Sequence, residues 1–288
     1  MVIGVPAETV FLGATDGLNS SRLRVMGRYA STNRGTMLFD WPGIAVTASL
    51  RGSRLSVVLS DVGNMYKVVV DGVDQRVLLT RESANQSYVL APELRYGNHV
   101  VVMIKRTEGM KPGGVSELHG FIADGFATPL HPPRVRRLLF VGDSICCGLG
   151  ALGKACCNVK LPRLEDATVG FAVQTADALG AEYQLACATG RGIVRNYGQA
   201  RGQWYHKTMP VLWRRRLVSD AAMGHWTFDT SWQPHVIVVH LGTNDFSTSG
   251  RPRQAEFVAT YRQFLSEVRT AVGKGGASVP IVLACGPM

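Results

Sequence analysis

The hydrophobic pattern of this chain changes its period near residue 135, and this change limits the possible fold more than any other feature. From about residue 24 to 125, apolar and polar side chains alternate in short runs such as "IAVTASL" and "RLSVVLS". In the first of these runs, Val46, Ala48 and Leu50 would share one face of a strand. Such alternation is typical of antiparallel strands with one buried face.

Turn signals separate these runs at residues 51–53, 71–72 and 96–98, each of which contains glycine. Many short strands with frequent turns predict an antiparallel sandwich of jelly-roll type. We therefore expect an all-β sandwich over residues 24–127, with residues 1–23 as an N-terminal extension that lies outside it.

The second part of the chain alternates strands with helices, which predicts an α/β domain with a parallel sheet covered on both faces. The run "HVIVVHLG" is apolar almost throughout, as a strand buried on both faces should be. This domain would span residues 137–288 in three layers, joined to the sandwich by the proline-containing segment 128–136. We expect strands at 137–142, 183–187, 235–242 and 279–285, and helices at 167–179 and 253–272.

The chain has 288 residues, a hydrophobic fraction of 46% and a formal charge of +10, which indicate a globular and basic protein. Its basic residues form short clusters, which we interpret as solvated faces: Arg134, Arg136 and Arg137; Arg214, Arg215 and Arg216; Lys105 and Arg106. Nucleic-acid binding would rest on net charge alone and is not expected. No apolar run reaches the ~18 residues of a membrane-spanning helix, so no membrane partner is expected either.

The six cysteines include no CxxC pair, so we expect no structural zinc site and no other metal. Two adjacent pairs occur, at residues 146–147 and 156–157. A disulfide between the pairs and free thiols in a reducing compartment are both compatible with this pattern.

Three polar motifs follow three of the expected parallel strands. "GDS" at 142–144 follows the first, "ATGRGI" at 188–193 the second and "LGTNDF" at 241–246 the third. Because ligands collect at the carboxyl ends of parallel strands, these loops can meet in space. The residue types suit acyl transfer: Ser144 as a nucleophile, with the backbone N–H of Gly190 and the amide of Asn244 as donors to an oxyanion.

These motifs resemble the first three sequence blocks of the SGNH (GDSL-type) hydrolases. Upstream, stretches such as "YKVVVDG", "IKRTEG" and "LHGFIADG" resemble the N-terminal jelly roll of carbohydrate esterase family 2. The resemblance covers nearly everything from about residue 24 to the end, in the right order. It implies a metal-independent and cofactor-independent serine esterase that removes O-acetyl groups from polysaccharides or sugars.

The resemblance assigns Ser144 as the nucleophile and its own N–H, the Gly190 N–H and the Asn244 amide as the oxyanion hole. Asp143 and Asp245 would hold their loops rather than contact substrate. Substrate contacts are expected from four further residues near the cleft: Arg191, Trp204, Trp226 and Phe246. Cys146 and Cys147 would serve packing, and the oligomeric state is left open.

The histidine of this family lies in a block that follows the strand ending in "CGPM", and the sequence ends there. We therefore expect that the catalytic histidine is not present and that the chain is a fragment with impaired activity. His240 precedes "LGTND" but matches no catalytic histidine of the family. The resemblance implies an extracellular protein, although the first residues lack the pattern of a secretory signal.

Two alternative functions remain open at this point. The chain could be a non-catalytic glycan-binding protein whose hydrolase half serves as a scaffold. It could also be an SGNH lipase or thioesterase, although the stretch at 198–220 is rather polar for a long apolar groove.

Overall fold

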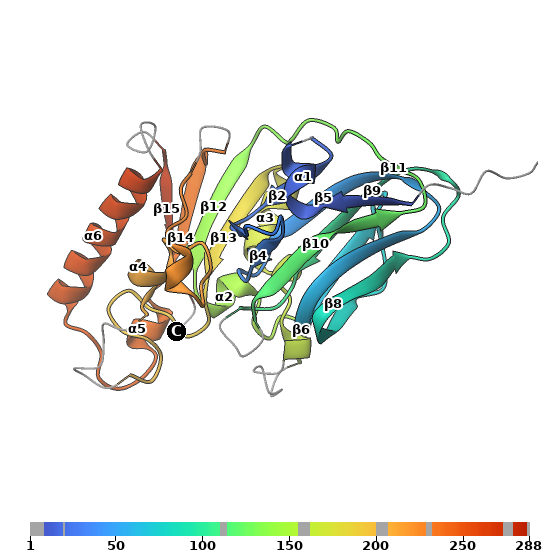
Figure 1. The fold of residues 1–288 in the computed structure, drawn as a ribbon. Coiled ribbons are helices and arrows are strands. Elements are labelled where there is room, and N and C mark those ends of the chain that lie inside the picture. Colours follow the sequence, from blue (N-terminus) through green and yellow to red (C-terminus); the bar gives the residue numbers. More distant parts are fainter. Residues whose placement is uncertain are drawn as a thin grey trace, which may run out of the picture.

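The protein consists of a curled antiparallel sheet and a separate parallel sheet with helices on both faces (Figure 1). The structure is a computed structural model that describes residues 9–19, 21–109, 114–154, 162–199, 207–228, 232–272 and 279–286. Within these residues no helix is both long and apolar enough to cross a membrane.

The antiparallel half contains one short helix and the strands up to β11, and the parallel half contains the remaining elements. In chain order, the first half comprises β1 Val10–Gly13, α1 Ala14–Asn19, β2 Leu23–Met26, β3 Ala30–Ser31, β4 Met37–Phe39, β5 Ala45–Gly52, β6 Leu55–Val70, β7 Val73–Asp74, β8 Leu78–Ala91, β9 Gly97–Lys105, β10 Ser116–Ala123 and β11 Phe126–Ala127. The second comprises β12 Arg137–Gly142, α2 Ser144–Cys147, α3 Phe171–Ala178, β13 Glu182–Cys187, α4 Met209–Leu212, β14 Val236–His240, α5 Thr243–Phe246, α6 Gln254–Ala271 and β15 Ile281–Ala284.

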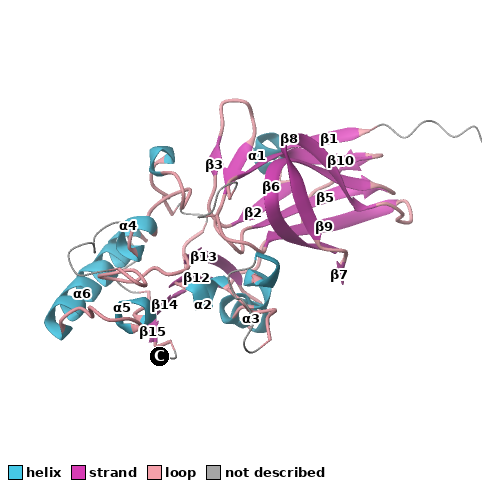
Figure 2. Cartoon of the chain, turned by 90° about the horizontal axis from the view of Figure 1, so that it is seen from below, coloured by secondary structure: helices cyan, strands magenta, loops and turns pink. Residues whose placement is uncertain are grey.

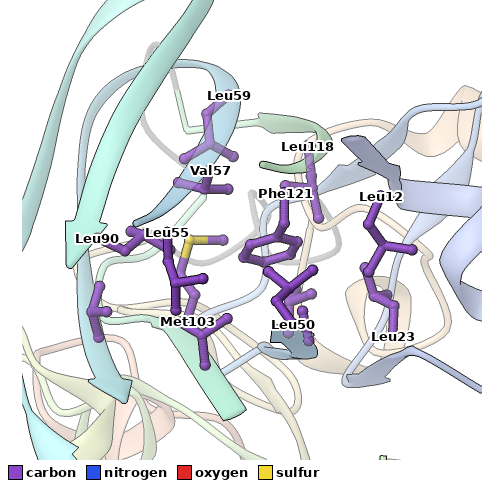
Figure 3. Packing of buried hydrophobic residues seen from close by; sticks show 14 of the residues in the cluster. Leu12, Leu23, Leu50, Leu55, Val57, Leu59, Leu90, Met103, Leu118 and Phe121 are labelled. Atoms are coloured by element: carbon purple, nitrogen blue, oxygen red, sulfur yellow. The ribbon is translucent and has the colours of Figure 1, made fainter. Parts of the chain in front are cut away.

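The antiparallel sheet curls around a core of alternating side chains, as the period of two predicts. The face of β5 with Val46, Ala48 and Leu50 is buried. It packs with inward residues of β6, β9 and β10 (Figure 3). Strand β6 lies between β10 and β9 in the sheet, because its first part pairs with β10 and its last part with β9. The pairing with β8 shifts register around Gly63, whose φ of +73° suits glycine.

The sheet begins before the expected boundary at residue 24. Strand β1, Val10–Gly13, pairs with β10 in antiparallel register, with Leu12 opposite Phe121. Leu12 is buried in the core, so this part of the expected N-terminal extension belongs to the sheet. The strand is too short for its alternation to stand out in the sequence.

The parallel sheet has the strand order β13-β12-β14-β15 within the described residues. Its strands and the long helix α6 lie close to the positions predicted from the apolar runs. In the segment expected to be helical at 167–179, a short 3₁₀ turn at 167–169 precedes α3. Residues 128–136 connect the two sheets without helix or strand.

Two apolar layers enclose the parallel sheet. Leu139 and Val141 of β12 face α4 and α6, whereas Leu138 and Phe140 face α2 and α3. Viewed from below, the helices α2 to α6 lie around the parallel sheet, whereas α1 lies among the antiparallel strands (Figure 2). Every residue of β13 is buried, and the Tyr183 N–H donates to the Met26 sulfur of the antiparallel half at 3.1 Å.

Buried polar contacts join the two halves. The Asp40 carboxylate accepts hydrogen bonds from the backbone N–H groups of Val218 and Ser219, at 2.8 and 2.9 Å, and from the Ser219 hydroxyl. Arg28 is fully buried, donates to the Trp213 carbonyl and lies 5.4 to 5.9 Å from three aromatic ring centres: Trp41, Trp213 and Phe228. Desolvation lowers the pKa of Arg28 to about 9.

The interpretation of the basic clusters as solvated faces is wrong for Lys105 and Arg106. Both side chains are buried, and each has polar partners inside the protein. Lys105 donates to the Asn64 side chain at 2.6 Å, and Arg106 forms an ion pair with Asp166 at 2.8 Å. Burial of a charge is tolerable when such partners are present.

Candidate active site

The first predicted loop places Ser144 directly after β12, at the first position of the short helix α2. Asp143 caps this helix, because its Oδ1 accepts a hydrogen bond from the Ile145 N–H at 3.1 Å. Ser144 is partly exposed, whereas Cys146 and Cys147 are buried, as expected for packing residues. A side chain at position 142 would come within 2.4 Å of the Cys146 Cβ, so only glycine allows this turn.

The second loop turns at Gly190, whose φ of +74° lies in the left-handed region. Its carbonyl accepts a hydrogen bond from the Tyr197 N–H at 2.8 Å. The third loop turns at Gly242, with a φ of +123°, and leads into α5, which carries Asn244 and Asp245. Each loop follows the carboxyl end of a parallel strand, as the sequence predicts.

The Asn244 side chain connects all three loops. Its Nδ2 donates to the Asp143 Oδ2 at 3.1 Å and to the Arg191 carbonyl at 2.9 Å, next to Gly190. The three motifs therefore meet at one edge of the sheet. Both amide hydrogens have acceptors here, so an oxyanion would compete with Asp143 or Arg191 for one of them.

Asp245 holds the neighbouring loop rather than its own. Its carboxylate accepts hydrogen bonds from three consecutive backbone N–H groups, those of Ile193, Val194 and Arg195, at 2.8 to 3.0 Å. Burial raises the pKa of Asp245, and these N–H groups oppose that shift. Burial likewise raises the pKa of Asp143, against the hydrogen bond from Ile145.

Of the residues predicted to contact substrate, Arg191 and Phe246 lie on the second and third loops, whereas Trp226 packs against the antiparallel half. Arg191 is half-buried beside Asn244, and desolvation lowers the pKa of its guanidinium. Phe246 packs edge-on against Phe257 at 4.9 Å between ring centres, on the side of α6. Trp226 packs against Tyr29 of the antiparallel half, at 5.8 Å. Trp204 lies outside the described residues.

An apolar groove of about 440 Å³ borders the third loop. Its walls come from Leu241 to Phe246, one face of α6 and the end of β15. Phe257, Tyr261 and Leu265 of α6, which lie at helical spacing, line it. The groove gives this edge of the sheet an apolar surface next to the loop that carries Asn244.

Among the histidines that the structure describes, His240 lies against the first of these loops. It is buried at the end of β14, and its Nδ1 lies 3.9 Å from the Asp143 Oδ1. Its ring packs against Phe171 with 5.2 Å between centres. The imidazole thus occupies the layer between β14 and α3 and faces the capping aspartate.

Glu108, which the sequence analysis did not single out, reaches this site from the antiparallel half. Its carboxylate accepts hydrogen bonds from the Thr189 N–H, at 2.7 Å, and from the Thr189 hydroxyl. Glu108 is buried, and desolvation raises its pKa to about 7. The sequence offers one signal for it, which is the charged stretch "KRTEG" directly after an apolar strand.

We expect Glu108 to make the free energy of unfolding depend on pH. Its pKa rises from 4.5 in the unfolded chain to about 7 in the fold, so its stabilising contribution is complete below pH 4.5. That contribution is lost as the pH rises through about 7, because the buried group then ionises. Relative to Glu108→Gln, the wild type should lose about 3 kcal/mol over this range. Urea denaturation of both proteins at several pH values measures this, and parallel profiles would contradict it.

The described residues contain no group of three or more His, Cys, Asp or Glu side chains arranged to hold a metal ion. Polar side chains and backbone N–H groups of the three loops form the candidate site. Within it, a partly exposed serine lies beside a buried amide and a glycine turn, which is an arrangement able to support nucleophilic acyl transfer.

Comparison with known proteins identifies relatives over most of the chain. Residues 25–133 match the family model "Carbohydrate esterase 2 N-terminal". An acetylxylan esterase / glucomannan deacetylase of Cellvibrio japonicus is 30% identical over 244 residues, covering 81% of this chain and 65% of the relative. The cellulase/esterase CelE of Acetivibrio thermocellus is 31% identical over 245 residues, covering 84% of this chain and 29% of the relative. The chain thus spans slightly less than two thirds of the first relative.

Solved structures give the same result for the fold. A family two carbohydrate esterase from Cellvibrio japonicus superimposes with a TM-score of 0.83 and 26% identity, covering 96% of this chain and 78% of that one. A family two carbohydrate esterase from Clostridium thermocellum, in complex with cellohexaose, gives 0.82 and 28%, with 92% and 78% covered. The chain therefore resembles the carbohydrate esterase 2 N-terminal family over residues 25–133 and shares its fold with the family 2 carbohydrate esterases over nearly its whole length.

Proposed function

We propose that the protein is a serine esterase that removes O-acetyl groups from carbohydrate through an acyl-enzyme. The observation that carries this proposal is the junction of three loops through Asn244, which brings Ser144 and Gly190 to one sheet edge. The relatives named as acetylxylan esterases and glucomannan deacetylases support the substrate class. In finer detail, we take the curled sheet, over about residues 24–127, as a jelly roll and residues 137–288 as an SGNH hydrolase domain.

In the proposed reaction, the Ser144 Oγ attacks the acetyl carbonyl carbon and its proton passes to a base. The Ser144 N–H, the Gly190 N–H and the Asn244 amide stabilise the oxyanion. Collapse of the tetrahedral intermediate breaks the bond to the sugar oxygen, which takes the proton from the base. Water, deprotonated by the same base, then attacks the acetyl-serine. The bond between the acetyl carbon and the Ser144 Oγ breaks, the Oγ takes the proton back from the base, and acetate leaves.

We infer that the base is a histidine outside the described residues rather than His240. A base for Ser144 must reach its hydroxyl directly or through one water molecule. The buried His240 ring instead faces Asp143 and packs on Phe171. Glycan binding without turnover would follow if no histidine completed the site.

His240→Ala is expected to lower kcat less than about 10-fold, because the ring supports Asp143 rather than the reacting serine. Acetate release by the full-length protein and by this variant, at equal folded concentration, measures the effect. His240→Gln provides a control that keeps most of the side-chain volume. A loss of 10³-fold or more in both variants would identify His240 as the base.

The apolar groove beside the third loop favours a second candidate function, hydrolysis of longer acyl esters or thioesters. Phe257, Tyr261 and Leu265 could contact an acyl chain whose carbonyl lies at Ser144. The lengths of the acyl chains that the protein hydrolyses separate this candidate from the deacetylase.

A series of p-nitrophenyl esters from acetate to octanoate, together with acetylated xylan and glucomannan, tests the proposed function. We expect the full-length protein to release acetate from the polysaccharides and to prefer acetate by at least about 10-fold in kcat/KM. A preference that rises with chain length would instead support the lipase or thioesterase function. Saturable carbohydrate binding without acetate release would support the glycan-binding function.

A further inference from the structure

The loop that carries Gly190 is held from the other half of the protein. Glu108 follows β9 of the antiparallel sheet, yet its carboxylate is hydrogen-bonded to Thr189, the residue before Gly190. We propose that Glu108 is a positioning residue for the oxyanion hole, fixing the Thr189 amide and through it the direction of the Gly190 N–H. This inference rests on the proposed function.

The contacts of Glu108 restrict Thr189 at two points. One carboxylate oxygen accepts from the backbone N–H at 2.7 Å and the other accepts from the side-chain hydroxyl. On the far side of Gly190, the Tyr197 N–H donates to the Gly190 carbonyl at 2.8 Å. The peptide group that carries the Gly190 N–H is therefore held from both sides, as an oxyanion donor requires.

Glu108 is itself held in place by the segment at 165–167. Its backbone N–H donates to the Glu165 carboxylate at 3.3 Å, and the Ala167 N–H donates to the Arg106 carbonyl at 3.1 Å. The same segment contacts the end of α2, because the Asp166 N–H donates to the Gly148 carbonyl at 3.1 Å. Residues 106–108 thus contact, directly or through one segment, both the nucleophile helix and the oxyanion loop.

The protonation of Glu108 can be followed experimentally through the groups around its carboxyl. The groups that face its carboxyl are Thr189, Cys147, Glu165 and Arg191. Burial raises the pKa of Glu108 to about 7, so it ionises in a range where the folded protein can be titrated. An amide proton that donates to a carboxylate should shift when that carboxylate takes up a proton.

Two substitutions of Glu108 test the proposal kinetically in the full-length protein. Glu108→Ala should lower kcat for acetate release about 10- to 100-fold and change KM less than about twofold, because the oxyanion forms only in the transition state. Glu108→Gln should retain kcat within about fivefold, because the glutamine side chain has nearly the same length and can still hydrogen-bond to Thr189.

Asp40→Asn is the matched control. Asp40 is also a buried carboxylate that accepts three hydrogen bonds across the two halves, but its partners are Val218 and Ser219. Asp40→Asn should lower the free energy of unfolding, while its kcat stays within about twofold of the wild-type value. Equal losses of kcat in Glu108→Ala and Asp40→Asn would show that any disturbed contact between the two halves lowers kcat, and would overturn the proposal.

The Thr189 amide resonance gives a second measurement, which does not depend on the alanine variant being folded. In the wild type, its ¹H shift should titrate with a midpoint near 7, and Glu108→Gln should abolish that titration. A titration of the Thr189 amide that survives unchanged in the glutamine variant would overturn the proposal.

The kinetic outcomes also separate this inference from the proposed function. A wild type that releases acetate and a Glu108→Ala variant with the same kcat would overturn the inference alone. A wild type no faster than Ser144→Ala would remove the proposed function, and the oxyanion hole with it.

Discussion

Replacing Ser144 by alanine is expected to lower kcat for acetate release from acetylated xylan by at least about 10³-fold in the full-length protein. The hydroxyl is the nucleophile of the proposed acyl-enzyme, and Ser144 lies at the first position of α2, after the carboxyl end of β12. Affinity for the carbohydrate should change little. The side chain is partly exposed, so we expect less than about 0.5 kcal/mol of change in stability.

Ser247→Ala provides the control for this experiment. Ser247 follows Asn244 in the third loop, and its hydroxyl donates to the Asn244 carbonyl at 3.4 Å. It removes a serine hydroxyl from the same region without removing the nucleophile, so activity should persist. Normal turnover by Ser144→Ala would exclude the acyl-enzyme mechanism at this residue.

Asn244→Ala is expected to lower kcat by about 10²- to 10³-fold, with KM changed less than about threefold. The amide is the one side-chain donor proposed for the oxyanion, and it also joins Asp143 to the Arg191 carbonyl. Steady-state kinetics on a soluble acetyl ester separate the two parameters. A rise in KM at constant kcat would instead mean that Asn244 contacts the ground-state substrate.

The stability of Asn244→Ala should be measured alongside its kinetics. Loss of two buried hydrogen bonds costs about 1 to 3 kcal/mol, which thermal or urea unfolding can detect. Activity should be compared at a temperature where the variant is fully folded. If cooling restores kcat in the variant, the kinetic loss came from unfolding rather than from the oxyanion hole.

The convergence of the three motifs could be predicted from the sequence because it follows from local patterns and one general rule. Apolar runs mark the strands, and the carboxyl ends of parallel strands share one edge of the sheet. The 3.1 Å contact between Asn244 and Asp143, 101 residues apart, has this origin. The long helix α6 could be predicted for the same reason, since helical period is a local property.

Contacts between the two halves could not be predicted in this way. Glu108 and Thr189 are 81 residues apart and belong to elements of different type, so no period relates them. Lys105 and Arg106 looked like surface charges, because the sequence does not show the Asn64 and Asp166 partners that make their burial tolerable. The short strand β1 was missed because four residues carry too little alternation.

The buried junction of Arg28 and Asp40 also bears on how such chains can be recombined. Separating the halves at residues 128–136 would leave the Asp40 carboxylate without its three donors and would expose the aromatic rings around Arg28. The antiparallel half therefore differs from a binding module on a flexible linker, which can be replaced without disturbing the rest of the chain. Chimaeras of related enzymes should exchange both sides of this junction together, with the crossover placed outside it.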